Sequence, residues 1–171
     1  SALSGSLDID VILDRLLNLI ERVVPYDAAS LLMLDRTLGR VSVARQRGYE
    51  QFGASIAAQM ATFSLSLAQA ENLTRMADTG RALIVPDTAA EANWISVAVT
   101  PYVRSWAGAP ITAQDQVIAF FSLDKREPGF YQPIHAERLS AFAGQAALML
   151  QNARLFETQQ RRAEEQRLLW H

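Results

Sequence analysis

The sequence predicts an α+β domain built on one antiparallel sheet, with helices at both ends of the chain. Residues 7–24, and the region from Pro133 onward, repeat apolar residues every three or four positions, as amphipathic helices do. Between these helices lie short apolar or alternating segments that are typical of strands. The strands follow one another in pairs joined by polar turns instead of alternating with helices, which favours antiparallel pairing.

Length and composition are those of an ordinary globular domain. The chain has 171 residues, of which 50% are hydrophobic and 20% charged, and its formal net charge is −2. This length predicts one domain, and the charge offers no basic surface for nucleic acid. No apolar run reaches the roughly 18 residues that span a bilayer. We therefore expect a cytoplasmic domain that contacts neither nucleic acid nor membrane.

The first helix, expected over residues 7–24, carries two apolar seams. One comprises Ile9, Ile12, Leu16, Leu19 and Val23, and the other comprises Leu13, Leu17, Ile20 and Val24. Ser6 or Asp8 can cap its start, and Pro25 can end it. Two apolar seams make a wider stripe than one contact surface usually requires. We expect one seam to pack on the sheet and the other to meet a second copy of the chain.

The first strands are expected at residues 28–34 and 41–47. A polar turn around Gly39 separates them, so the two segments predict a hairpin. Residues 50–78 then show helical spacing in two places without a clear boundary.

The second half of the sheet is expected to begin with a short strand at residues 82–85, which Pro86 ends. Residues 88–103 predict a loop with a helical turn. Residues 105–111 and 117–123 predict a second hairpin, whose second strand is apolar at nearly every position. That pattern is typical of a strand covered on both faces.

The last helix is expected from Pro133 to the end of the chain. Its apolar stripe comprises Leu139, Phe142, Ala143, Ala146, Met149, Leu150, Ala153 and Phe156. After Glu157 the helix becomes polar, and no Gly or Pro ends it. We expect residues 158–171 to begin a linker helix that leads to a further domain.

These segments resemble the GAF domain of bacterial sensory proteins. The resemblance is carried by VVPYDAASLLMLD (23–35), ALIVPDT (82–88), Trp94, VRSWAGAPI (103–111), VIAFFSLDK (117–125), GF (129–130) and AFAGQAALMLQNARLFE (141–157). It extends over nearly the whole chain, and residues 1–157 are predicted to form the domain. It implies a GAF/PAS-like sheet of five or six strands, with the first and last helices packed together on one face and a pocket on the other. It also implies a regulatory module joined to an output domain such as a histidine kinase.

Several ligands known for GAF domains do not fit this sequence. Members that bind cyclic nucleotides carry an acidic pair after a phenylalanine, whereas Phe130 is followed by Tyr131, Gln132, Pro133 and Ile134. Covalent bilin attachment and reduction of free methionine sulfoxide both need cysteine, which the chain lacks. Haem or iron would need histidine ligands, and the two histidines are His135 and His171. We expect no cofactor, no metal and no catalytic residue.

Three aromatic residues are candidates for binding a ligand. Trp94, Tyr102 and Trp106 fall where the resemblance places the pocket wall. Aromatic rings with a polar atom suit a planar small molecule, and they suit a packed core equally well.

Four polar residues complete the candidate site. Asp87 can accept a hydrogen bond from a ligand or cap a helical turn, and the cap is favoured. Arg104, next to Ser105, can bind a carboxylate or phosphate. For Arg104, a structural ion pair with Asp87 or Asp124 is favoured over a role in ligand binding.

The terminal helices are the predicted dimer interface. We expect Leu16, Leu19 and Val23 to lie near Met149, Ala153 and Phe156, with some of these side chains facing a second chain. The leading hypothesis is a non-enzymatic, small-molecule-sensing domain that forms a homodimer through these helices and passes a signal to an output domain. The alternative is a ligand-free dimerisation and spacer domain whose own side chains fill the pocket.

Overall fold

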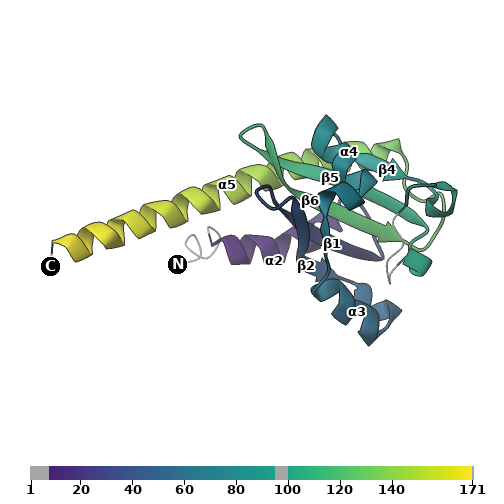
Figure 1. Ribbon diagram of the computed structural model, residues 1–171, viewed down its shortest axis with the longest axis horizontal. Helices are drawn as coiled ribbons and strands as arrows, with labels where there is room; N and C mark the ends of the chain where they lie inside the picture. Colours follow the sequence, from purple (N-terminus) through teal and green to yellow (C-terminus); the bar gives the residue numbers. More distant parts are fainter. Residues whose placement is uncertain (1–7, 95–99, 171) are drawn as a thin grey trace.

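The α+β prediction is confirmed by a computed structural model, which describes residues 8–94 and 100–170. One six-stranded sheet has the order β3-β2-β1-β6-β5-β4, and every neighbouring pair is antiparallel (Figure 1). The strands are β1 (Ala28–Asp35), β2 (Arg40–Arg47), β3 (Ser64–Ser66), β4 (Leu83–Val85), β5 (Ser105–Ala113) and β6 (Gln116–Lys125). The α-helices are α2 (Ile9–Ile20), α3 (Ala54–Ala61), α4 (Glu71–Thr79) and α5 (Pro133–Leu169).

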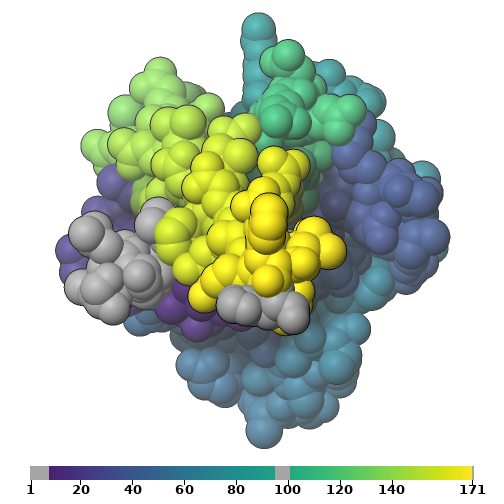
Figure 2. Space-filling view, turned by 90° about the vertical axis from the view of Figure 1, so that its left-hand side faces the viewer, coloured from purple at the N-terminus to yellow at the C-terminus, as the bar shows by residue number. Residues whose placement is uncertain are grey.

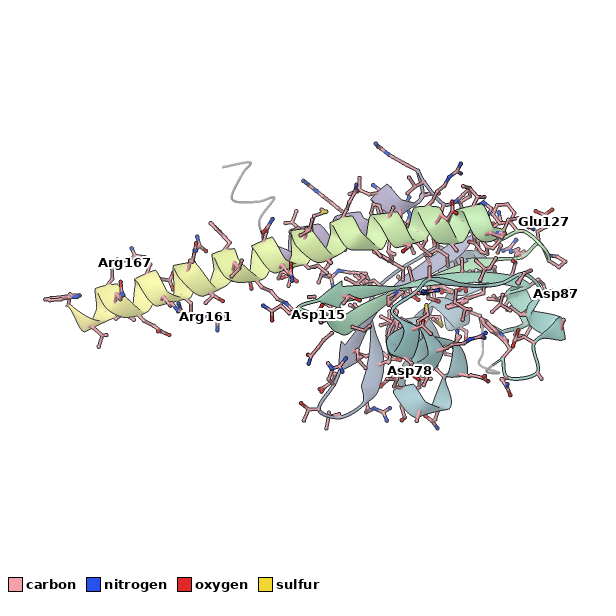
Figure 3. The ribbon with its side chains drawn as sticks, turned by 90° about the horizontal axis from the view of Figure 1, so that it is seen from above. Asp78, Asp87, Asp115, Glu127, Arg161 and Arg167 are labelled. Carbon is pink, nitrogen blue, oxygen red and sulfur yellow. The ribbon has the colours of Figure 1, made fainter. Side chains whose placement is uncertain are left out.

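The sheet separates two hydrophobic cores. The helices α2 and α5 pack together on one face, while α3 and α4 lie on the other, so that α5 and Asp78 of α4 are on opposite sides of the sheet (Figure 3). Side chains alternate across β6: Phe121 and Leu123 join the α2–α5 core, whereas Phe120 faces α3 and α4. This alternation explains why the strand is apolar at nearly every position.

The first helix is shorter than the sequence predicts. Asp8 caps α2 by accepting a hydrogen bond from the backbone N–H of Asp10 at 2.9 Å, whereas Ser6, the other candidate cap, lies outside the described residues. The helix ends at Ile20, and a turn covers residues 21–24. Backbone N–H groups in this turn bond to carbonyls three and four residues earlier, so the chain leaves the helix before Pro25.

Ion pairs attach α2 to the neighbouring strand β2. Arg45 contacts Asp14 at 2.6 Å and Asp10 at 3.3 Å, and Arg47 contacts Glu21, in the turn that follows the helix, at 3.3 Å. All of these groups are partly exposed, so each pair contributes less than about 1 kcal/mol. Burial of the apolar α2 face therefore provides most of the attachment energy.

The last helix is one unbroken element of 37 residues. It begins with Pro133 in the first turn, and His135 Nδ1 accepts a hydrogen bond from the backbone N–H of Gln132 at 2.9 Å. Its C-terminal part extends beyond the sheet and stands out toward the viewer in Figure 2. Because α5 continues through residue 157, no change of secondary structure marks the predicted boundary there, which stays a prediction.

Two regions contain more structure than the sequence predicts. The segment between α3 and α4 includes β3, which extends the sheet beyond β2. In its described residues, the loop before β5 contains two short 3₁₀ turns, Thr88–Ala90 and Thr100–Tyr102. Within the described ranges, no helix is both long enough and apolar enough to span a bilayer.

Candidate ligand-binding pocket

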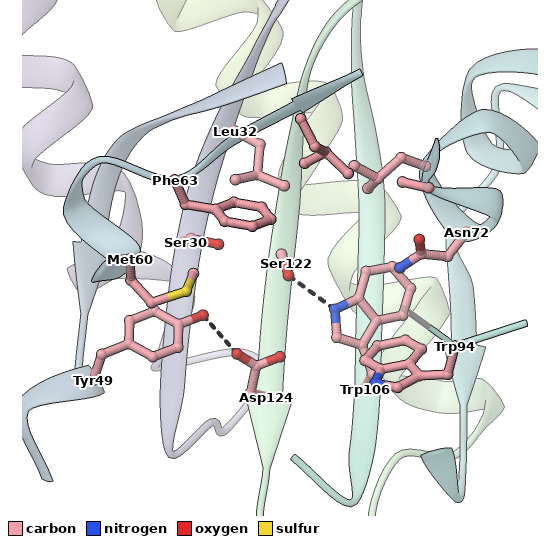
Figure 4. Close-up of a pocket in the computed structure, with 13 residues that line it drawn as sticks. Ser30, Leu32, Tyr49, Met60, Phe63, Asn72, Trp94, Trp106, Ser122 and Asp124 are labelled. Atoms are coloured by element: carbon pink, nitrogen blue, oxygen red, sulfur yellow. Dashed lines mark hydrogen bonds between the residues drawn. The ribbon is translucent and has the colours of Figure 1, made fainter. Parts of the chain in front are cut away.

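A cavity of about 90 Å³ lies between the sheet and the α3–α4 layer. The strands β1, β5 and β6 form its floor, and the remaining walls come from the elements between β2 and β5 (Figure 4). Its lining comprises Ser30, Leu32, Tyr49, Met60, Phe63, Leu65, Ala70, Asn72, Leu73, Trp94, Trp106, Ser122 and Asp124. The lining is mainly apolar, with a few polar groups, as in many small-molecule sites.

Strand register brings the polar groups of the floor together. Ser30 lies opposite Ser122, and Trp106 lies opposite Asp124. Alternate residues of a strand face the same side, so Ser122 and Asp124 of β6 share the pocket face. The residue between them, Leu123, belongs to the opposite core.

Trp106 lies flat over its own strand. A Cβ atom at Gly108 would overlap the Trp106 ring and come within 3.0 Å of Met76, so the indole occupies space that any other residue at position 108 would fill. The Trp106 Nε1–H donates a hydrogen bond to Ser122 Oγ at 2.8 Å. Trp94 packs edge-on against it, with ring centroids 5.6 Å apart. Trp94 Nε1 is buried, and no described residue accepts a hydrogen bond from it.

Asp124 is a buried carboxylate at the edge of the cavity. Only 5% of its surface is exposed, and the Tyr49 hydroxyl donates a hydrogen bond to its Oδ2 at 2.5 Å (Figure 4). Burial raises the pKa of Asp124 from 3.8 to about 7, and the hydrogen bond from Tyr49 partly opposes this rise. Burial and the nearby Asp124 raise the pKa of Tyr49 as well, so Tyr49 remains a hydrogen-bond donor at neutral pH.

Three of the seven predicted ligand-binding residues line this cavity, namely Trp94, Trp106 and Asp124. Their binding role stays a prediction. Asp87 caps the turn Thr88–Ala90 by accepting a hydrogen bond from the Ala89 backbone N–H, and it contacts Arg104 at 3.5 Å. The favoured interpretations of Asp87 and Arg104 are therefore confirmed, and neither residue lines the pocket.

Tyr102 and Ser105 are also placed away from the cavity lining. Tyr102 is 40% exposed and stacks on Phe52, with ring centroids 5.0 Å apart. Ser105 is buried, and its Oγ accepts a hydrogen bond from the Tyr131 backbone N–H at 3.1 Å. Neither residue lines this cavity, and Ser105 faces the opposite side of β5 from Trp106, the residue that follows it. A binding role for either residue stays a prediction.

The sequence interpretation missed Tyr49, Ser30, Ser122 and Asn72 as lining residues. Tyr49 lies in the 3₁₀ turn Tyr49–Phe52, 75 positions from its partner Asp124. No local motif signals such a pairing. Ser30 and Ser122 carry a weak signal, since each is a hydroxyl residue within an apolar strand that is buried on both faces.

The predicted interface residues divide into buried and partly exposed groups. Leu16 and Ala153 have no exposed surface and belong to this chain's own α2–α5 core, so they are not available to a second chain. Leu19, Met149 and Phe156 are half-buried, and Val23 is exposed. The exposed surface of α5 also includes Leu148 and Leu155, which the interface prediction omitted.

The described residues offer no evident metal site. No group of three or more histidine, aspartate or glutamate side chains in residues 8–94 and 100–170 is arranged to hold an ion. His135 supports the start of α5 and stacks on Phe130.

A family model described as "GAF domain" matches residues 6–151, a span that includes all six strands and the pocket. The chain belongs to the GAF domain family. GAF domains are regulatory modules of multidomain sensor and signalling proteins. Comparison of this GAF domain with curated proteins gave no match.

Solved structures share the fold at low sequence identity. A GAF domain/HD domain protein of Geobacter sulfurreducens aligns with a TM-score of 0.72 and 20% identity, covering 90% of this chain and 98% of that chain. A domain of a protein described as a two-component sensor histidine kinase, from Sinorhizobium meliloti 1021, gives 0.65 and 14%, covering 88% and 96%. The free methionine-R-sulfoxide reductase of Neisseria meningitidis gives 0.66 and 12%, covering 86% and 88%. These similarities show a common fold.

Proposed function

We propose that this GAF domain is a cytoplasmic, non-enzymatic module that senses a small molecule and regulates a linked output domain. The observation that carries the proposal is the cavity beside Asp124, which is floored by the sheet and walled by Trp94 and Trp106. A carboxylate that has been moved out of water costs free energy unless something compensates for its burial. A site of this kind is more consistent with binding than with simple core packing.

The fold offers a direct route from the pocket to the long helix. Asp124 and Ser122 face the pocket, while Leu123 of the same strand packs in the α2–α5 core. A ligand that changes the position of β5 or β6 would change the packing of α5 on the sheet's other face. The physical requirement is that the ligand binds one of these arrangements more tightly than the other.

The proposal includes a homodimer formed through the helices. Leu148 and Leu155 are 62% and 61% exposed on α5, and their spacing of seven residues places them on one side of the helix. Exposed apolar side chains on one helix face are suited to a symmetric contact with a second copy. Signals would then pass along paired α5 helices to an output domain such as a histidine kinase, as the Sinorhizobium meliloti protein's description suggests.

No catalytic role is proposed for this domain. The reductase from Neisseria meningitidis shares its fold at 12% identity. As expected from the resemblance, reduction of free methionine sulfoxide proceeds through cysteines, and this chain has none. Asp124 and Tyr49 form a hydrogen-bonded pair, and the Ser122 hydroxyl in the same cavity accepts a hydrogen bond from Trp106 Nε1.

A matched pair of substitutions tests the sensor proposal. Ala70 is buried and lines the cavity, whereas Ala68 is exposed two residues earlier. Ala70→Leu fills the cavity, and Ala68→Leu adds the same side chain outside it. In a thermal-shift screen of metabolites, we expect at least one compound to stabilise the wild type and Ala68→Leu but not Ala70→Leu. A ligand at 100 times its Kd adds about 2.7 kcal/mol of stability, which raises Tm by several degrees.

The small size of the cavity favours a second candidate function, that of a spacer domain. Typical ligand pockets have volumes of about 300–1,000 Å³, whereas this cavity measures about 90 Å³. In a spacer the cavity is a packing defect, so Ala70→Leu would raise the melting temperature of the free protein. That result, together with no stabilising compound for the wild type, would reject the sensor proposal.

A further inference from the structure

The charges around the cavity restrict the ligands that it can bind. Asp124 is the one acidic residue among the lining residues, and no lysine, arginine or histidine of the described chain lines the cavity. Arg104, which the sequence suggested could bind an anion, is instead paired with Asp87. A ligand carboxylate or phosphate would therefore meet the Asp124 carboxylate without a compensating cation. This arrangement disfavours anionic ligands.

Asp124 itself lacks a cationic partner in the described structure. None of the ion pairs formed by residues 8–94 and 100–170 includes it, and the adjacent Lys125 pairs with Asp27 at 3.4 Å. A carboxylate can accept about four hydrogen bonds, and the described residues supply one, from Tyr49. Asp124 therefore has both the charge and the hydrogen-bonding capacity to bind a positively charged donor.

The walls next to Asp124 are suited to the apolar body of such a donor. Figure 4 shows Tyr49 and Met60 on one side of the carboxylate, and Trp94 and Trp106 on the other. Phe63 and Leu32 lie farther along the same space. Aromatic rings attract a cation through their negatively charged faces, and the attraction is stronger where water is excluded. One carboxylate and several aromatic rings thus surround a single small volume.

We propose that this pocket binds a compact organic ammonium ion, with its N–H donating to Asp124 and its apolar body against Trp94, Trp106 and Phe63. The inference rests on the proposed sensing function and adds the chemical class of the ligand. The ion pair formed on binding would replace the hydration that Asp124 loses on burial. The bound amine supplies the positive charge that residues 8–94 and 100–170 do not place at this site.

Comparing amines with their alcohol counterparts tests directly whether the pocket binds an ammonium ion. The probes are propylamine, cyclohexylamine and 2-phenylethylamine, each compared with 1-propanol, cyclohexanol or 2-phenylethanol by titration calorimetry. The measurements use the full chain at about pH 8, where Asp124 is ionised and an alkylamine keeps its proton. We expect at least one amine to bind at least about tenfold more tightly than its alcohol, because an ammonium forms a charge-assisted hydrogen bond.

Variants of two acidic residues separate charge recognition from a general effect of removing an acid. Asp124→Asn preserves the side-chain shape, and we expect it to weaken amine binding at least about tenfold while leaving alcohol binding unchanged. Asp87→Asn removes an acid outside the pocket and should bind amines as the wild type does. If Asp124→Asn does not fold, the amine-to-alcohol ratio of the wild type still decides the question.

The possible failures are distinguishable. Equal binding of amine and alcohol, unaffected by Asp124→Asn, would overturn the ammonium inference and leave the sensor proposal standing. Absence of binding by all three amines would also overturn the inference, while the metabolite screen with Ala70→Leu decides the sensor proposal separately. Amine binding that is as tight in Asp124→Asn as in the wild type would also overturn the inference, because a group other than Asp124 would then hold the cation.

Discussion

Asp124 makes the stability of the domain depend on pH. Burial raises the pKa of this carboxyl group from 3.8 to about 7, so the folded protein holds the proton more tightly than the unfolded chain does. Between about pH 4 and pH 7, the contribution of Asp124 to the free energy of unfolding therefore falls as pH rises. The maximum slope for one proton is about 1.4 kcal/mol per pH unit. Above about pH 7 both states are ionised, and the effect becomes constant.

Asp124→Asn should remove this pH-dependent contribution to the free energy of unfolding. Urea unfolding of the wild type and the variant across this pH range measures it, and the difference in stability between them should shift in favour of the variant as pH rises. Asp87→Asn, which alters a partly exposed carboxylate, is the control. An identical pH profile for wild type and Asp124→Asn would mean that Asp124 is already ionised in the folded protein across the whole range.

Sequence reasoning at single positions was most successful where the function of a residue is local. The Asp87 cap depends on a backbone N–H two residues away. The Arg104–Asp87 pair follows from the pairing of β4 with β5, in which Val85 lies opposite Trp106. Tyr49, by contrast, reaches the pocket because the chain returns to the same face of the sheet after a hairpin and a turn. Its pairing with Asp124 is a tertiary contact, and no spacing within the sequence reports it.

At the level of elements, substitutions on the exposed side of α5 test the proposed homodimer. Leu148→Glu and Leu155→Glu each place a charge on the exposed side of the helix, away from this chain's own core. Each substitution should weaken dimerisation more than tenfold, because burying an unpaired charge in an apolar contact costs more than about 1.4 kcal/mol. Size-exclusion chromatography with light scattering, over a range of concentrations, measures the dissociation.

Leu38→Glu is the matched control, since Leu38 is similarly exposed but lies in the turn between β1 and β2. It should leave the oligomeric state unchanged. A wild type that remains monomeric at tens of micromolar would refute the interface, as would leucine variants that dimerise like the wild type.

Element prediction succeeded where a periodic pattern extends over several turns or strand residues. Both hairpins and the last helix were predicted because their apolar residues repeat and clear turns separate them. The strand β3 has three residues, too few to show a period, and it is recognisable only through its pairing with β2. The end of α2 was misplaced because the apolar spacing continues through Val24, a buried residue that belongs to the turn and not to the helix.

The whole molecule places its candidate pocket and its candidate interface on opposite faces of one sheet. The strands β5 and β6 contribute residues to both faces, and α5 rests on β5 before it extends past the sheet (Figure 1). If the domain is a sensor, occupancy of the cavity must change how two α5 helices lie relative to each other. A spacer requires no such change.

The distance between the two α5 helices of a dimer can be measured by pulsed electron paramagnetic resonance. The chain has no cysteine, so Arg161→Cys, at an exposed position on the extended part of α5, accepts a single spin label on each protomer. We expect a stabilising ligand, at saturation, to shift the distribution of distances between labels, and the same compound to have no effect in Arg161→Cys combined with Ala70→Leu. An unchanged distribution, with the ligand shown to be bound, would contradict the proposal that the pocket signals through α5.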